Sequence, residues 1–205
     1  LFAQGRDEEM LALAQEAVSL GAATGGFEGE TFGIFVLGRV RQDLDQKQEA
    51  RELWQQTITL ARHYQRFQPE NDLLHEAHWM AHNWLRGSAL HFGDYTASRD
   101  HVVQALQICQ TVGKRWGELF CLAALAGIDF FLYDFDAAAA GFTAALELAQ
   151  QLNYRRVEMI AKDGLAGVCR LRGNYTTAAL LQEQAVDLAV ELAFPYDEAQ
   201  FLATL

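Results

Sequence analysis

The sequence predicts an all-α protein, a right-handed superhelical solenoid of antiparallel helix hairpins. Three observations predict this class. Helix-forming residues are abundant, and the 205 residues include only two prolines. Amphipathic stretches follow one another with short turns between them. Three turn motifs, Gly93-Asp94-Tyr95, Tyr133-Asp134-Phe135 and Gly173-Asn174-Tyr175, recur at a spacing of 40 residues, which is typical of helical repeats.

The helices can be placed in chain order from this period. We expect full helices over Asp7–Leu20, Glu30–Leu44, Gln46–Tyr64, Asp72–Phe92, Tyr95–Val112, Arg115–Leu132, Asp136–Leu152, Tyr154–Arg172 and Tyr175–Leu192, and the start of another near Tyr196. Paired in sequence, they make about four and a half repeats in a single domain, 1–205. Both ends interrupt a repeat, so we expect a fragment of a longer protein.

Local signals support the individual helices. The first helix has acids in its first turn, where the helix dipole favours negative charge, and it ends at Gly21. The later second helices share the pairs Ala105-Leu106, Ala145-Leu146 and Ala185-Val186, again 40 residues apart. Thr57 holds the same column in an earlier repeat, but 48 residues separate it from Ala105. The eight extra residues fall in the connector over residues 65–71, and such insertions often lie on the working face of a solenoid.

Small residues recur where repeats should pack closely. Gly87, Gly127 and Gly167 form one column of the first helices, and Ala50, Ser98, Ala138 and Ala178 form one column of the second helices. We expect large residues in these columns to push the helices apart, at about 1–3 kcal/mol each.

A family resemblance rests on the same positions. Leu165-Ala166, Gly173-x-Tyr175, Ala178 and Ala185 reproduce the spacing of the tetratricopeptide repeat (TPR), as do Leu125-Ala126, Tyr133-x-Phe135, Ala138, Phe142 and Ala145. The chain resembles TPR proteins over its whole length. Its period exceeds the standard repeat of about 34 residues, and this long form is similar to the sensor region of MalT-like bacterial transcriptional regulators.

The resemblance implies a protein- or ligand-binding module, the sensor or interaction segment of a cytoplasmic bacterial signalling or transcriptional regulator. Its partner would be a protein, a peptide or a small-molecule effector, with no cofactor. The positions that line the family's concave groove fall on Asn83, Gly87, Leu90 and His91, then on Ala123, Gly127, Phe130 and Phe131, and then on Asp163, Gly167 and Arg170. This mixture of apolar and polar groups suits a peptide or a small polar ligand.

The candidate binding residues are His78, His82, Asn83, Arg86, Phe130, Phe131, Asp163 and Arg170. Two alternatives stay open. In one, Phe130 and Phe131 belong to the hydrophobic core and do not line a groove. In the other, the solenoid is a passive scaffold that holds partners together.

A histidine stripe offers a function of another class. His75, His78 and His82 share one face of a helix, and three imidazoles at this spacing could hold a transition metal in a metal-binding or metal-dependent protein. The residues around Glu76 do not form the HExxH motif of zinc proteases. Because the aligned positions of later repeats are also polar, we favour a solvated or groove-lining stripe over a metal site.

Composition and motifs exclude several classes. The net charge of −11 disfavours contact with nucleic acids and anionic membranes. No apolar stretch is long enough to span a bilayer. Cys109, Cys121 and Cys169 read as reduced thiols of a cytosolic protein.

No catalytic residue is predicted. The glycine-rich stretch 21–31 lacks the Lys-Ser/Thr of a P-loop, and no serine lies in a nucleophile elbow, so we expect no enzyme activity. Apolar residues near the ends, such as Phe201 and Leu202, should allow self-association of uncapped repeats.

Overall fold

The computed structural model describes residues 2–192, with side chains from residue 9 onward. This part of the chain contains nine α-helices and no strand: α1 (Phe2–Thr24), α2 (Phe27–Asp43), α3 (Lys47–Gln65), α4 (Asp72–His91), α5 (Tyr95–Thr111), α6 (Arg115–Phe131), α7 (Phe135–Gln151), α8 (Arg155–Leu171) and α9 (Tyr175–Glu191). The all-α class is confirmed. The residues expected near Tyr196, and Phe201 and Leu202 with them, lie outside the described residues.

The 40-residue turn motif has a simple physical basis. Gly93, Tyr133 and Gly173 each adopt the left-handed conformation, with φ of 73°, 63° and 76°, and this conformation ends the preceding helix. The next residue in each motif then caps the following helix: Asp94 accepts a hydrogen bond from the backbone of Ala97, Asp134 from Ala137 and Asn174 from Thr177. The motif therefore specifies one helix end and one helix start.

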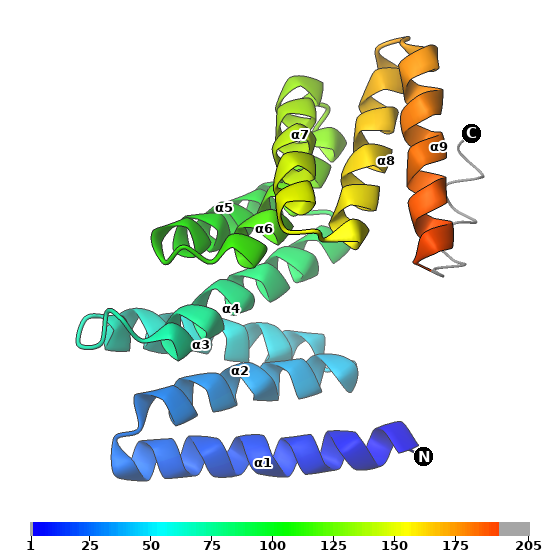
Figure 1. Ribbon diagram of the computed structural model, residues 1–205. Helices are drawn as coiled ribbons and strands as arrows, with labels where there is room; N and C mark the ends of the chain where they lie inside the picture. The colour runs from blue at the N-terminus through cyan, green and yellow to red at the C-terminus, as the bar shows by residue number, and fades with distance from the viewer. Residues whose placement is uncertain (1, 193–205) are drawn as a thin grey trace. The chain divides into compact units, whose positions relative to one another are not determined.

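The chain divides into two compact units, Leu1–Val112 (unit 1) and Gly113–Leu205 (unit 2). In unit 1, consecutive helices from α1 to α5 pack on one another, and α2 also contacts α4. In unit 2, α6 to α9 pack in the same way, and α6 contacts α8 (Figure 1). Each unit is thus a stack of antiparallel hairpins in which consecutive first helices touch. The single domain predicted for 1–205 stays a prediction.

Each unit has its own aromatic core. Trp54 of α3 is fully buried in unit 1 and stacks on Trp84 of α4, with 5.3 Å between ring centroids. In unit 2, Phe142 of α7 is 5% exposed and packs with Leu119 and Val157. These large side chains fill the space between hairpins that a single hairpin cannot close.

The extra residues of the third repeat form the connector between α3 and α4. Asn71 caps α4, because its side chain accepts hydrogen bonds from the backbone of Leu73 and Leu74, each at 3.1 Å. The Asn71 amide also donates to Glu28 of α2, which ties the connector to the preceding repeat. The predicted position of the connector is therefore confirmed.

The packing role predicted for the glycine column is wrong at two of its three positions. A Cβ atom added to Gly87 or Gly127 would meet nothing within 4 Å, whereas one at Gly167 would lie 3.3 Å from the Phe130 ring. The tight contacts are at other glycines: a Cβ at Gly38 would lie 2.4 Å from Trp54, and one at Gly164 would lie 2.4 Å from Phe142. Whether a glycine is required for packing therefore depends on the size of the side chain that faces it, and not on its position in the repeat.

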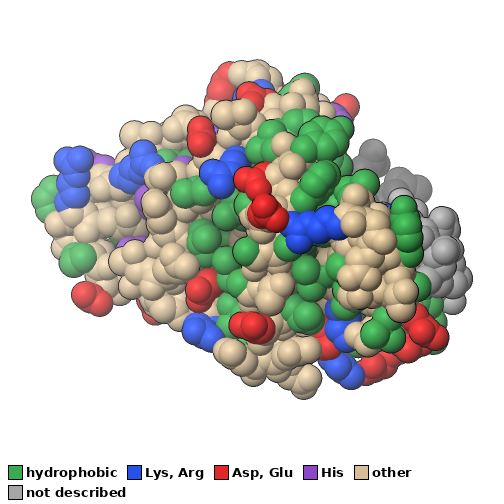
Figure 2. Space-filling view, turned by 90° about the horizontal axis from the view of Figure 1, so that it is seen from above, with side chains coloured by type: hydrophobic (Ala, Val, Ile, Leu, Met, Phe, Trp, Pro, Cys, Tyr) green, Lys and Arg blue, Asp and Glu red, His purple; other side chains and the backbone are tan. Residues whose placement is uncertain are grey.

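No helix among residues 2–192 has the length and apolarity needed to cross a bilayer. On the face shown in Figure 2, acidic and basic side chains are interspersed with hydrophobic ones. Cys109 and Cys121 are buried and Cys169 is half-buried, and none of the three forms a disulfide within the described part of the chain.

Candidate functional site

Unit 2 contains a pocket of about 320 Å³ on its first helices, which we call the unit 2 pocket. It is lined by Gly127, Phe130, Phe131, Phe142, Asp163, Gly164, Gly167 and Arg170. Four of the eight predicted site residues, Phe130, Phe131, Asp163 and Arg170, therefore lie around one cavity.

Helical spacing brings these side chains to one face. On α6, Phe130 and Phe131 follow Gly127 by three and four residues, and on α8 Gly167 and Arg170 follow Asp163 by four and seven. Phe131 is 54% exposed and Phe130 is half-buried, so Phe131 is not the core residue of the alternative interpretation. The two rings meet edge to face, with 6.2 Å between centroids.

Asp163 supplies the negative charge of this pocket. Its carboxylate accepts a hydrogen bond from Gln182 Nε2 of α9 at 3.0 Å, and the Gln182 side chain is itself buried. Burial raises the pKa of Asp163, while the Gln182 hydrogen bond and the positive charge of Arg170 lower it. The net shift is upward, so the environment does not fully compensate the ionised carboxylate.

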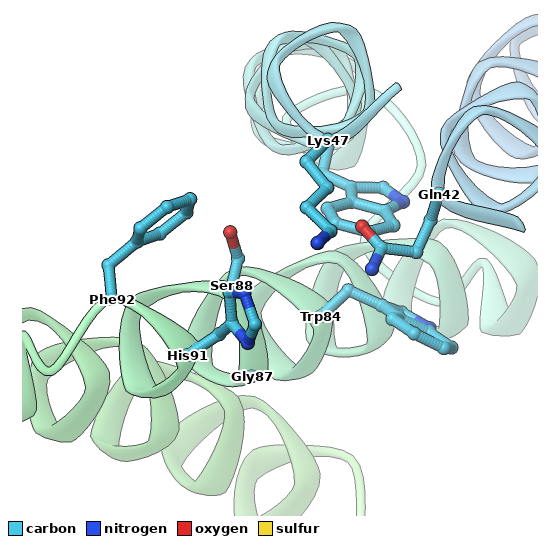
Figure 3. A pocket seen from close by; sticks show the side chains of 8 residues that line it. Gln42, Lys47, Trp84, Gly87, Ser88, His91 and Phe92 are labelled. Atoms are coloured by element: carbon cyan, nitrogen blue, oxygen red, sulfur yellow. The ribbon is translucent and has the colours of Figure 1, made fainter. Parts of the chain in front are cut away.

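Unit 1 has a pocket of about 380 Å³, the unit 1 pocket. It is lined by Gln42, Lys47, Trp54, Trp84, Gly87, Ser88, His91 and Phe92. Figure 3 shows that α4 contributes most of the labelled side chains and that Lys47 extends toward them from the start of α3. Two of the groove positions expected from the sequence, Gly87 and His91, lie here.

The charged groups around the unit 1 pocket are mainly basic. Lys47 pairs with Asp45 at 3.1 Å, and Arg39 lies over the Trp84 ring at 4.3 Å from its centroid. Arg51 lies 5.5 Å from the centroid of the Phe92 ring. Sequence reasoning missed Trp84 and Phe92 as pocket residues, although each is adjacent in sequence to a predicted groove position, Asn83 or His91.

The same glycine column reaches both pockets. Gly87 lines the unit 1 pocket, while Gly127 and Gly167 line the unit 2 pocket. A glycine inside a helix costs about 1 kcal/mol relative to alanine, and packing does not require it at Gly87 or Gly127. At these two positions no side chain extends into the pocket.

The sequence analysis expected His78 and His82 on a solvated or groove-lining stripe, and this expectation is wrong. They are 6% and 4% exposed and lie in the interior of unit 1, outside the unit 1 pocket. His78 Nδ1 donates to Gln65 Oε1 at 3.2 Å, and His82 Nδ1 lies 3.1 Å from His101 Nδ1 of α5. The correction has a physical reason: α3 and α5 cover this face of α4.

Burial sets the protonation of this histidine cluster, formed by His78, His82 and His101. Burial lowers the pKa of His78 to about 4, helped by the charges of Arg62 and His75. It lowers the pKa of His82 to about 3, with further contributions from His78, His101 and Arg62. Both imidazoles are therefore neutral at neutral pH, and their buried Nε2 atoms have no hydrogen-bond partner among the described residues.

The geometry does not favour the metal alternative. His75 is held elsewhere, since its Nε2 donates to the Pro69 carbonyl at 2.7 Å and its Nδ1 lies 3.1 Å from Gln65 Nε2. Among residues 9–192, whose side chains the structure describes, no group of three or more His, Cys, Asp or Glu side chains is placed to hold a metal ion.

The remaining predicted residues, Asn83 and Arg86, lie together on α4. The Arg86 guanidinium donates from Nε to Asn83 Oδ1 at 3.0 Å, and both side chains are half-buried. Neither lines the unit 1 pocket. The eight candidates therefore separate into a pocket set, an interior pair and this bonded pair.

No family model and no curated protein matches this sequence. Several solved structures have a similar fold. RapI in its apo form superposes with a TM-score of 0.81 at 13% identity, over 97% of this chain and 54% of that one. A Rap protein complexed with Competence and Sporulation Factor gives 0.68 at 12% identity, over 98% and 54%. The TPR-like repeats of a kinesin light chain from Podosopora anserina give 0.65 at 18% identity, over 93% and 90%.

These likenesses concern the fold. The chain spans about half the length of the two Rap structures, and all three identities are low. The stacked hairpins, the recurring turns and the structural neighbours all indicate the same repeat fold. The chain has the fold of TPR-type helical repeat proteins.

Proposed function

We propose that this chain is a peptide-binding repeat module that receives its ligand in the pockets of its first helices. The observation that carries the proposal is the glycine column. Gly87 and Gly127 hold equivalent repeat positions, each opens into a pocket, and each weakens its helix without a packing requirement. The unit 2 pocket adds apolar rings and two charged groups, the usual lining of a specific ligand site.

A structural neighbour supports a binding function for this fold. One Rap protein was solved in complex with Competence and Sporulation Factor. The wider setting that we propose is the sensor or interaction segment of a cytoplasmic bacterial regulator, on the resemblance of the 40-residue repeat to MalT-like proteins. The segment would act by binding, with no catalysis of its own. A passive scaffold is the second candidate, and it would bind partners without a change in repeat packing.

Filling the pocket floor should abolish binding while the fold stays intact. In Gly127→Leu, the new side chain enters the cavity without meeting other atoms near its Cβ. Helix α6 gains about 0.8–1 kcal/mol in intrinsic helix propensity. We expect peptides selected from a phage-displayed library of random dodecapeptides on the full chain to lose affinity by about tenfold or more. The melting temperature should not fall.

Matched controls separate blocking from side effects. Ala140→Leu adds the same side chain at an exposed position of α7, and Ala12→Leu does so on α1. Both should bind selected peptides as the wild type does, and Gly87→Leu tests the unit 1 pocket in parallel. Selected peptides that bind both glycine variants with wild-type dissociation constants would contradict the proposal, as would a library from which nothing is enriched.

A further inference from the structure

The unit 2 pocket combines one carboxylate with aromatic rings. Phe130, Phe131 and Phe142 line it from α6 and α7, and Asp163 from α8. Asp163 accepts a hydrogen bond from Gln182, but a carboxylate can accept about four, so acceptor capacity is left. The aromatic faces carry negative partial charge. Carboxylate and rings therefore attract the same kind of group, a cation on an apolar stem.

The alternatives are disfavoured by the same groups. An apolar side chain would remove more water from Asp163 without pairing its charge, which is costly for a half-buried carboxylate. An anionic side chain would be attracted by Arg170, but Asp163 and the net charge of −11 repel it. A neutral polar side chain could hydrogen-bond to Asp163 but would gain nothing from the ring faces.

We propose that the unit 2 pocket selects a peptide by a Lys or Arg side chain, whose stem packs on Phe130 and Phe131 and whose cationic head pairs with Asp163. This inference rests on the peptide-binding function proposed above and names the residue type that the pocket reads. The acidic protein as a whole attracts such a ligand, and the pocket supplies the short-range selection.

Arg170 tunes this selection. It lines the same pocket and its charge acts on Asp163, so it partly offsets the field that a ligand cation meets. Removing the charge of Asp163 and removing the charge of Arg170 must then act in opposite directions. A pocket that binds only through its apolar rings would respond weakly to both changes.

Four sets of acetylated, amidated heptapeptide libraries test the selection on the full-length chain. The central residue is fixed as Lys, as norleucine, which keeps the stem without the charge, as Arg, or as citrulline, its neutral counterpart. The other six positions are random, and binding is followed by competition with a fluorescein-labelled peptide from the phage selection. We expect Lys and Arg sets to compete about tenfold better than their neutral counterparts.

The variants identify the residues responsible. Asp163→Asn should remove the preference for Lys and Arg, and Arg170→Gln should increase it several-fold, while both keep the wild-type melting temperature. Equal competition by charged and neutral sets, with binding still abolished in Gly127→Leu, overturns the inference and leaves the peptide-binding function standing. If no set competes in a Gly127-dependent way, the proposed function itself fails.

Discussion

Acidification from pH 6.5 to pH 4.5 should destabilise unit 1 by several kcal/mol. His78 and His82 are buried, with pKa values of about 4 and about 3 instead of 6.5. Between these values the unfolded chain binds protons that the folded unit excludes. The contribution of each neutral histidine to the free energy of unfolding is therefore fully present above pH 6.5. It decreases by about 1.4 kcal/mol for each pH unit as the pH falls toward the folded-state pKa.

The positive charges near His78 and His82 lower the pKa values of these histidines, in the same direction as burial. The groups that act on the histidine cluster are Arg62 and Arg51 of α3, His75 of α4, and Asp94, Asp100 and His101 around α5. The carboxylates of Asp100 and Asp94 raise the pKa of His101, but burial, the largest effect, keeps that pKa below its ordinary value. These carboxylates therefore do not cancel the effect of burial at His101.

Urea unfolding at pH 7.0 and pH 4.5 measures the effect. Three tryptophans lie in unit 1 and only Trp116 lies in unit 2, so fluorescence of a Trp116→Phe variant reports unit 1 alone. The double variant His78→Leu, His82→Leu should lose most of the pH dependence, and the exposed His91→Leu should keep it. All six histidines precede residue 113, so helices α6 to α9 provide an internal reference. Equal pH dependence in wild type and double variant would refute the assignment.

Replacing Gly38 by alanine should lower the free energy of unfolding of unit 1 by about 1–3 kcal/mol. The added Cβ would lie 2.4 Å from Trp54 Nε1 and 2.7 Å from Cδ1. The indole is fully buried and stacks on Trp84, so the new methyl group fits only if this stacked pair shifts. The clash outweighs the helix propensity that alanine brings to α2.

Gly87→Ala is the matched control for this substitution. It makes the same chemical change in the middle of α4, but the new methyl group meets nothing within 4 Å. We expect it to stabilise unit 1 by about 0.5–1 kcal/mol. Urea midpoints followed by circular dichroism compare the two variants, and a shift of the same sign in both would show that the Trp54 contact is not limiting.

The sequence predicted helices α3 to α9 well because their ends are specified locally. The first helix was predicted wrongly over Asp7–Leu20: α1 spans Phe2–Thr24, continues past Gly21 and has no acid in its first turn. Gly93-Asp94 carries both the left-handed residue that stops α4 and the cap that starts α5, so the period translates directly into element boundaries. The clustering of Phe130, Phe131, Asp163 and Arg170 was also predictable, because helical spacing and the TPR register determine which residues of α6 and α8 share a face.

Burial and close packing were less predictable because they depend on the facing helix. The polar residues aligned with His78 and His82 suggested solvent, yet α3 and α5 cover the two histidines. Gly38 and Gly127 look alike in the sequence, but only Gly38 faces a tryptophan. A repeat pattern specifies position along the stack, whereas the size of the opposite side chain is particular to each repeat.

The turn at Tyr133 leaves room to raise the thermal tolerance of this scaffold. Its φ of 63° is the conformation that Gly93 and Gly173 adopt in the neighbouring repeats, and the ring is 81% exposed. A bulky side chain in this conformation costs about 1–2 kcal/mol of folding free energy. Glycine would avoid this cost, although its greater loss of backbone entropy on folding offsets part of the gain. The regular geometry of the hairpin is thus compatible with a less strained consensus turn, at a position that lines neither pocket.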